Sequence, residues 1–274
     1  MKKKIIPVIL AIVLILIIGC VSFGGIIIDK YSYSKERADL AAYYSISGND
    51  DVAIVLQNEI IEERARLFDG VYYLDIDTVH KYLNERFYED KNENLLLYTL
   101  PEDIVRTSIG SSVREDALGS EDLGYALSRY EGDTLYIAID YVKKYTNFGY
   151  EAFTEPNRIQ LDTVWEDMQT AQIKKDTQVR VKGGIKSEIL TDVRKGDKVV
   201  VLEQMETWSK VKTSDSIMGY VENKRLSDLR SELPIPVTDY KEPEYTAITR
   251  DYKINLGWHV VAGVAGNDTL YDVT

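Results

Sequence analysis

The sequence predicts three kinds of structure in one chain: a membrane anchor, an α+β domain built on an internal repeat, and a small all-β barrel. Three observations lead to this prediction. Residues 5–28 form one uncharged apolar run, a twelve-residue string occurs twice at an offset of 63 positions, and five short apolar runs separated by turn residues lie within 174–230. Such runs, repeats and spaced turns are typical of a spanning helix, a repeated unit and a barrel.

The first segment is long enough to cross a bilayer. Residues 5–28 contain 24 consecutive uncharged residues, which as a helix would span about 36 Å. Lysines occupy positions 2 to 4, and this positive flank predicts a cytoplasmic tail at 1–4, with 29–45 as the juxtamembrane segment. The predicted location is therefore the cell membrane, as a single-pass protein with a cytoplasmic N-terminus and an extracytoplasmic bulk.

Two alternatives to an anchor stay open. A cleaved signal peptide would have a shorter apolar region that ends in a small-x-small cleavage site, and this sequence does not contain one there. Ile17-Ile18-Gly19-Cys20 resembles a bacterial lipobox, which would make Cys20 the lipidated first residue of a mature lipoprotein. Apolar sequence continues for eight residues past Cys20, so we favour a membrane-buried thiol.

Composition limits the partners and cofactors. Cys20 is the only cysteine, so no intramolecular disulfide can form and each outer domain must depend on its own core. The net charge of −12 predicts a surface that repels nucleic acid. With two histidines, His80 and His259, and no second cysteine, we expect no zinc or copper site and no other cofactor.

An internal repeat organises the predicted domain at 46–165. Residues 73–84 (YLDIDTVHKYLN) and 136–147 (YIAIDYVKKYTN) align without a gap, and seven of the twelve positions are identical. In each copy, apolar residues at helical spacing precede two strand-like runs around a polar turn, so we expect a strand, a short helix and a hairpin. Residues 104–130 show no pattern that decides between a loop and a strand pair.

This repeated pattern resembles the copper amine oxidase N-terminal-type domain, a wall-associated module of exported bacterial proteins. The resemblance covers both repeat copies well and 104–130 poorly. It implies a structural module and not a copper site, because the sequence holds no cluster of metal ligands.

The repeat also contains a superficial likeness to a catalytic signature. Residues 68–77 (FDGVYYLDID) resemble the D-x-x-D-x-D-x-E signature of family 18 glycoside hydrolases, but no glutamate follows at the required spacing. Asp77 recurs as Asp140 in the second copy, so a position at a helix N-terminus explains both aspartates better. We therefore predict no catalytic residue here.

Residues 174–230 read as a compact barrel of five short strands. The string VRVKGGIKSEILTDVRKGDKVVVLEQMETWSKVKTSDSIMGYVENKRL resembles the bacterial SH3-like domain, above all in KGDKVVVLE, in WSKV at 208–211 and in GYV at 219–221. The resemblance implies binding of cell-wall peptide or glycan. Trp208 and Tyr220 are then the candidate ligand contacts, since aromatic faces suit sugars and peptides. The alternative, which we rank first for each residue, is a place in the barrel core.

The C-terminal part changes character after the barrel. Pro234, Pro236 and Pro243 predict an extended spacer at 231–247. In 248–274, the sequence predicts a buried strand from Ile254 to Val261. KINLGWH resembles the first strand of a family 18 glycoside hydrolase, which implies the C-terminal fragment of a (β/α)8 barrel. The catalytic acid of such a barrel would lie beyond Thr274.

Two functions from different classes follow from these patterns. The first is the non-catalytic targeting region of a membrane-anchored, cell-wall-associated family 18 glycosidase, whose parent hydrolyses peptidoglycan or a chitin-like glycan. The second is a complete, non-enzymatic SH3-domain protein that binds the cell wall or acts as an adaptor. In both, the expected partners are the membrane and cell-wall peptide or glycan, without nucleic acid or metal.

Overall fold

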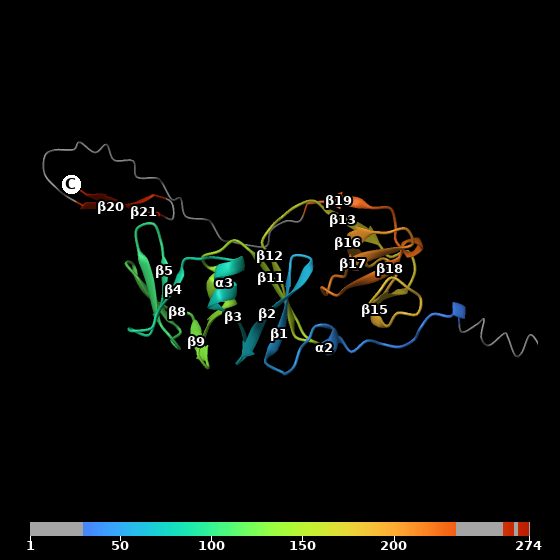
Figure 1. Ribbon diagram of the computed structural model, residues 1–274, viewed down its shortest axis with the longest axis horizontal. Helices are drawn as coiled ribbons and strands as arrows, with labels where there is room; N and C mark the ends of the chain where they lie inside the picture. The colour runs from blue at the N-terminus through green and yellow to red at the C-terminus, as the bar shows by residue number, and fades with distance from the viewer. Residues whose placement is uncertain (1–29, 234–259, 266–267, 274) are drawn as a thin grey trace, which may run out of the picture. The chain divides into compact units, whose positions relative to one another are not determined.

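The computed structural model describes residues 30–233, 260–265 and 268–273 (Figure 1). These residues fall into two compact units, which we treat separately. The barrel unit consists of residues 30–43 and 167–232, and the main body of the repeat unit is 44–166. The chain therefore begins the barrel unit, forms the body of the repeat unit, and then returns to complete the barrel unit.

Two sheets with mainly antiparallel strands make up most of the repeat unit. The larger has the strand order β11-β12-β1-β2-β3-β10-β9, in which only the β1 and β12 pair is parallel. Its strands are β1 (Asp51–Leu56), β2 (Glu59–Phe68), β3 (Val71–Asp75), β9 (Ser128–Glu131), β10 (Thr134–Ala138), β11 (Gly149–Phe153) and β12 (Arg158–Asp162). The smaller is a meander of β4 (Phe87–Asp90), β5 (Leu95–Thr99), β6 (Ile104–Ser108), β7 (Val113–Asp116) and β8 (Gly119–Asp122). Residues 104–130, which had no prediction, are thus mainly strands.

The structure confirms the strand, helix and hairpin of each repeat copy. Helix α3 (Ile76–Tyr82) follows β3, and helix α4 (Ile139–Lys143) follows β10. The Asp75 side chain caps α3, since it accepts hydrogen bonds from the Thr78 backbone amide at 2.9 Å and from the Thr78 hydroxyl at 2.6 Å. Asp77 and Asp140 lie in the first turns of the two helices, as expected. Both helices pack on the pair of strands β3 and β10.

Buried aromatic rings form much of the repeat unit's core. Phe87 lies 4.7 Å from Tyr98 between ring centroids, and Tyr98 stacks on Tyr145 at 4.2 Å. Tyr141 meets Tyr145 edge to face at 5.4 Å. Such pairs add roughly 0.5–1.5 kcal/mol each beyond the area that they bury. Part of the high tyrosine content of the sequence is therefore explained by this core.

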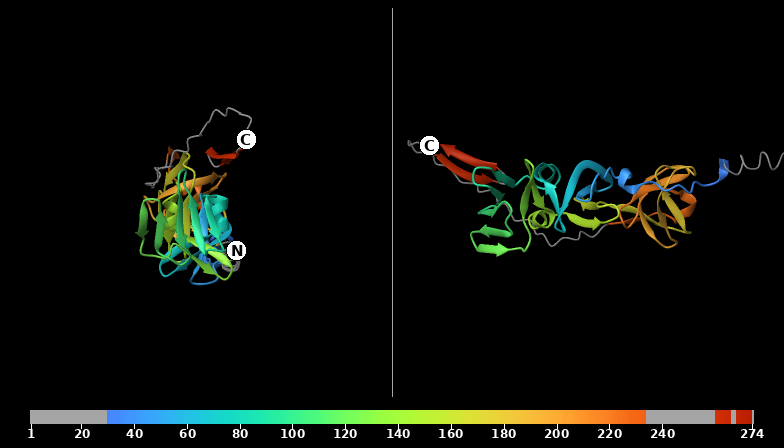
Figure 2. Two further views of the ribbon diagram at one scale, coloured as in Figure 1. Left: turned by 90° about the vertical axis from the view of Figure 1, so that its left-hand side faces the viewer. Right: turned by 90° about the horizontal axis from the view of Figure 1, so that it is seen from below.

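The barrel unit is one antiparallel sheet of strand order β15-β14-β18-β17-β16-β13-β19 that curls around an aliphatic core (Figure 2). Its strands are β13 (Met168–Gln172), β14 (Thr177–Arg180), β15 (Ile189–Val193), β16 (Lys198–Gln204), β17 (Trp208–Lys212), β18 (Met218–Glu222) and β19 (Arg230–Glu232). The five strands predicted from the sequence are β14 to β18. Gly219 lets β14 cross β18 closely, because a Cβ there would lie 2.6 Å from the Arg180 carbonyl oxygen.

The predicted fold class is wrong in its balance of helix and strand. We expected an α+β domain at 46–165, but its helices α3 and α4 have only seven and five residues, and strands form most of the rest. The helical spacing in the two repeat copies does correspond to α3 and α4. The described chain is nevertheless mostly β-sheet, because each helix is only one or two turns long.

The structure does not support the prediction of a single-pass membrane protein. Within residues 30–233, 260–265 and 268–273, no helix is long and apolar enough to cross a bilayer. The predicted anchor at 5–28, with Cys20 inside it, lies outside the described residues. The cell-membrane localisation that depended on this anchor is therefore not supported either.

The prediction of a (β/α)8 barrel fragment at the C-terminal end is wrong as well. Strands β20 (Val260–Ala265) and β21 (Asp268–Val273) pair antiparallel, with Val260 opposite Val273. A (β/α)8 barrel is instead built from parallel strands, each followed by a helix. This hairpin contradicts the start of such a barrel. His259 and the spacer from 234 onward lie outside the described residues.

Candidate functional site

The strand register places the two predicted contact residues on one face of the barrel unit. In the antiparallel pair of β17 and β18, Trp208 lies opposite Glu222 and Lys210 lies opposite Tyr220. Because side chains alternate along a strand, these four residues share one side, which we call the outer face. The residues between them are buried on the other side of the sheet: Ser209, Val211 and Val221.

Trp208 and Tyr220 converge on Gly183. A Cβ atom at Gly183 would lie 3.2 Å from the Cβ of Trp208 and 3.6 Å from Cδ1 of Tyr220. Both aromatic residues are half-buried, and neither is part of the hydrophobic core. The core consists of aliphatic residues from the opposite side of the sheet, such as Val179 and Val211. Neither the core role nor ligand contact is decided by this arrangement, so ligand contact by Trp208 and Tyr220 stays a prediction.

A segment from far upstream packs on the barrel unit. We call residues 32–43 the strap. The Ala38 amide donates to the Ile189 carbonyl at 2.9 Å, and the Ile189 amide donates to the Glu36 carbonyl at 2.8 Å, as between neighbouring strands. Further along, the side chains of Ala38, Leu40 and Tyr43 pack against the core. The strap therefore adds to the edge of β15 and completes the unit.

Arg180 connects the strap to the sheet. Arg180 is only 2% exposed. Both terminal nitrogens of its guanidinium donate to the Ser34 carbonyl at 3.1 Å. One of them also donates to the Ser187 carbonyl, and the guanidinium lies 5.5 Å from the ring centroid of Tyr33. Burial lowers the pKa of Arg180 from its usual value. The guanidinium is thus committed to holding the strap in place.

Glu222, the acid of the outer face, is also engaged by the strap. Its carboxylate accepts hydrogen bonds from the Tyr33 hydroxyl at 2.9 Å and from the Lys224 ammonium at 2.8 Å. Lys224 also donates to the Tyr33 oxygen at 3.0 Å, and the carboxylate raises the pKa of Lys224. Arg225 Nε lies 3.8 Å from the second carboxylate oxygen. The negative charge of Glu222 is therefore already balanced.

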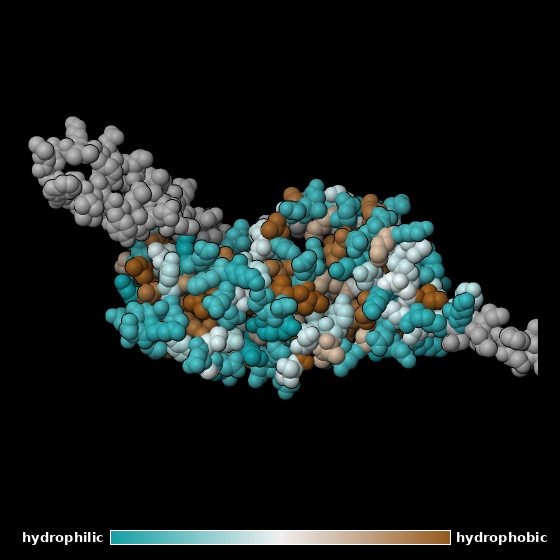
Figure 3. Space-filling model, viewed as in Figure 1, coloured by the Kyte–Doolittle hydropathy of each residue, from teal (hydrophilic) through white to brown (hydrophobic). Residues whose placement is uncertain are grey.

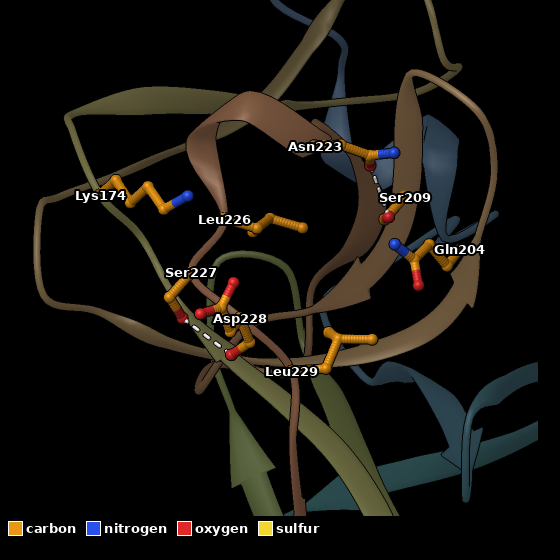
Figure 4. Close-up of a pocket in the computed structure, with 8 residues that line it drawn as sticks. All are labelled: Lys174, Gln204, Ser209, Asn223, Leu226, Ser227, Asp228 and Leu229. Carbon is orange, nitrogen blue, oxygen red and sulfur yellow. Dashed lines mark hydrogen bonds between the residues drawn. The ribbon is translucent and has the colours of Figure 1, made fainter.

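A cavity of about 270 Å³ is lined entirely by residues of the barrel unit (Figure 4). Figure 4 shows Gln204 and Ser209 on one side and Lys174, Ser227 and Asp228 on the other. The Ser209 hydroxyl donates to the Asn223 side-chain oxygen at 2.7 Å. Asn223 also donates to the Met205 and Glu206 carbonyls at 2.6 and 3.2 Å. These bonds secure the turn before Trp208 and so support the outer face.

Other kinds of site find little support in the described part of the chain. Across it, no three or more His, Cys, Asp or Glu residues are grouped so as to hold a metal. His80 Nε2 lies 2.6 Å from the Phe87 carbonyl oxygen, a contact within the repeat unit. On the face drawn in Figure 3, apolar groups form small separate patches among hydrophilic ones. Scattered apolar residues of this kind are ordinary for a protein surface.

Comparison with known proteins supports one part of the sequence interpretation. A family model described as "Bacterial SH3 domain" matches residues 175–227. No curated protein and no solved structure matched the chain. The matched region contains β14 to β18 with both Trp208 and Tyr220, and it leaves out the strap, β13 and β19. The chain therefore carries a bacterial SH3 domain at residues 175–227.

Proposed function

We propose that the chain binds bacterial cell-wall material, a peptide or a glycan, through the outer face of its SH3 domain. Trp208 and Tyr220 are the contact residues. The observation that carries this proposal is their convergence beside Gly183, outside the core and partly open to solvent. Indole and phenol rings offer apolar faces with a polar end, which suits the C–H faces of sugars and the backbone of peptides.

The surroundings of these rings favour binding without large rearrangement. Strands β17 and β18 fix the two backbones, and Asn223 secures the turn that precedes Trp208. The strap holds Tyr33 beside Glu222, which is the cross-strand neighbour of Trp208. A face that is already ordered loses less conformational entropy when a ligand binds.

The proposal covers binding and no catalytic step. It corresponds to the second of the two functions predicted from the sequence, a wall-binding or adaptor protein. The family 18 glycosidase depended on the C-terminal barrel fragment, which the antiparallel hairpin of β20 and β21 contradicts. We retain the resemblance of residues 46–165 to the copper amine oxidase N-terminal-type domain as part of this proposal, with the role of a structural module.

Sedimentation with isolated sacculi tests the proposal. The purified chain should sediment with protein-free sacculi, and Trp208→Ala and Tyr220→Ala should each weaken binding roughly ten-fold, equivalent to about 1.4 kcal/mol. Tyr88→Ala is the matched control, because Tyr88 is an aromatic residue of the repeat unit with 53% exposure. Far-ultraviolet circular dichroism should show that all variants are folded. Unchanged binding by both outer-face variants would contradict the proposal.

A further inference from the structure

Charge is divided unevenly between the two units. Residues 30–43 and 167–232 hold 16 Lys and Arg against 13 Asp and Glu, a net charge of +3. Residues 44–166 hold 11 against 25, a net charge of −14. The unit with the SH3 domain is therefore cationic within an acidic protein. Charges on a binding face select ligands of the opposite sign and raise the rate of encounter.

Lys210 is the cation among the four residues that define the outer face. It lies opposite Tyr220 on β18 and two residues from Trp208 on the same side of β17. On its other flank, Glu203 of β16 lies opposite Lys210 in register. Within the described residues, Lys210 has no hydrogen-bonding or ionic partner. Its ammonium group is available to a ligand.

The carboxylate directly opposite Trp208 is, by contrast, already paired. Glu222 accepts hydrogen bonds from both Tyr33 and Lys224. Lys224 thus offsets the charge of an acid that would otherwise disfavour an anion at this face, and Tyr33 of the strap occupies the same carboxylate oxygen. Lys210 therefore neighbours both aromatic residues, and the carboxylate of Glu222 is already paired.

We propose that Lys210 binds an anionic group of the wall ligand, a carboxylate or a phosphate, between Trp208 and Tyr220. This inference rests on the proposed function and defines the chemistry of the ligand. A carboxylate of a wall peptide and a phosphodiester of a wall polymer share the negatively charged oxygens that an ammonium group binds. The aromatic rings then contact the uncharged part of the same ligand.

Four variants of the full chain test the role of Lys210 by sedimentation with sacculi. Lys210→Gln should weaken binding about three- to ten-fold, the range expected of a partly exposed charge-assisted hydrogen bond. Lys210→Arg should retain most of the binding, because it keeps the charge. Glu203→Gln should bind equally or more tightly, since it removes a nearby acid. Lys195→Gln is the matched control, because it makes the same change of charge at an exposed turn of the same unit and should bind as the parent does.

Two chemical treatments of the sacculi distinguish the sources of the anion. Hydrofluoric acid removes phosphodiester polymers, and carbodiimide with ammonia converts carboxylates to amides. Whichever treatment abolishes the difference between the parent chain and Lys210→Gln identifies the anion, and either result supports the inference.

The outcomes also separate this inference from the proposed function. If Lys210→Gln binds untreated sacculi as the parent does while Trp208→Ala fails to bind, the anion site is refuted and the aromatic contacts stand. A Lys195→Gln variant that weakens binding as much as Lys210→Gln would mean that net charge alone acts, which also overturns the inference. If the aromatic variants bind normally as well, the proposed function falls with it.

Discussion

Leu74 on β3 and Ile137 on β10 lie directly opposite each other, fully buried, and each is the other's counterpart in the sequence repeat. On either side of this pair, Tyr73 lies opposite Ala138 and Asp75 lies opposite Tyr136. In the repeat, Tyr136 is the counterpart of Tyr73 and Ala138 is the counterpart of Asp75, so the repeat offset converts one flanking pair into the other. The repeat copies are therefore related by a local two-fold axis through this central pair. The same axis relates helices α3 and α4, each of which packs on both strands.

The central pair should be decisive for the stability of the repeat unit. Leu74→Ala and Ile137→Ala each leave a cavity at a fully buried position, and each should lower the free energy of unfolding by about 2–5 kcal/mol. Urea unfolding followed by circular dichroism measures the change. Leu118→Ala at a residue with 98% exposure is the control, with an expected change within about 0.5 kcal/mol. An unaltered transition for Ile137→Ala would speak against the central position of this pair.

The two helices should differ in their dependence on a cap. Asp75→Ala removes the side chain that caps α3, and we expect a loss of about 1 kcal/mol in the free energy of unfolding. Ala138 occupies the corresponding position before α4, where no side-chain cap is present. Asp77→Ala, in the first turn of α3, should cost less, because it removes only an interaction with the helix dipole. Equal losses for the two aspartates would contradict the assignment of Asp75 as the cap.

The strap should loosen when Arg180 is replaced. Arg180→Met removes the hydrogen bonds to the Ser34 and Ser187 carbonyls. We expect the strap to open more often and trypsin to cleave faster after Lys35 and Arg37, as followed by mass spectrometry. Lys182→Met, at an exposed position two residues away, is the control and should leave the cleavage rate unchanged. Equal cleavage of Arg180→Met and the parent would show that the strap is held by its other contacts alone.

Buried tyrosines should make the repeat unit sensitive to alkaline pH. Burial raises the pKa of Tyr125 to about 12, and it raises the pKa values of Tyr141 and Tyr150 further above the ordinary value of 10.0. A raised pKa in the folded state means that the neutral phenol contributes stability in full below pH 10 and loses it as the pH rises toward the folded value. Unfolding should therefore begin above about pH 10.

Absorbance at 295 nm, which reports tyrosinate, should rise together with the loss of circular dichroism. Tyr141→Phe removes one ionisation that opposes the folded state. If the variant and the parent are compared under conditions of equal stability at neutral pH, the midpoint of alkaline unfolding should lie at higher pH for the variant. Complete ionisation of the tyrosines around pH 10 with an unchanged circular dichroism spectrum would refute this account.

Local patterns in the sequence were sufficient for the elements of the two repeat copies and for β14 to β18, but not for the strands within 104–130. The spacing of apolar residues and the polar turns predicted the strand, helix and hairpin of each repeat copy, because these features depend on residues a few positions apart. The turns of the SH3 domain likewise predicted β14 to β18, and the aromatic positions Trp208 and Tyr220 followed from the family resemblance. The same patterns exaggerated the helix content, because they indicate that a helix begins without showing how soon it ends.

Long-range pairing was decided only in the folded structure. Nothing local shows that strap residues near Arg37 lie beside Ile189, that Leu74 faces Ile137, or that Trp208 belongs to the outer face. Such pairings depend on which strand edges remain open and which side chains fill the core once distant segments meet. The sequence by itself determined the elements of the repeat copies and the SH3 domain. The tertiary structure decided the strands within 104–130, the two-fold repeat, the strap and the pairing of Glu222, because these arise from contacts between segments far apart in the chain.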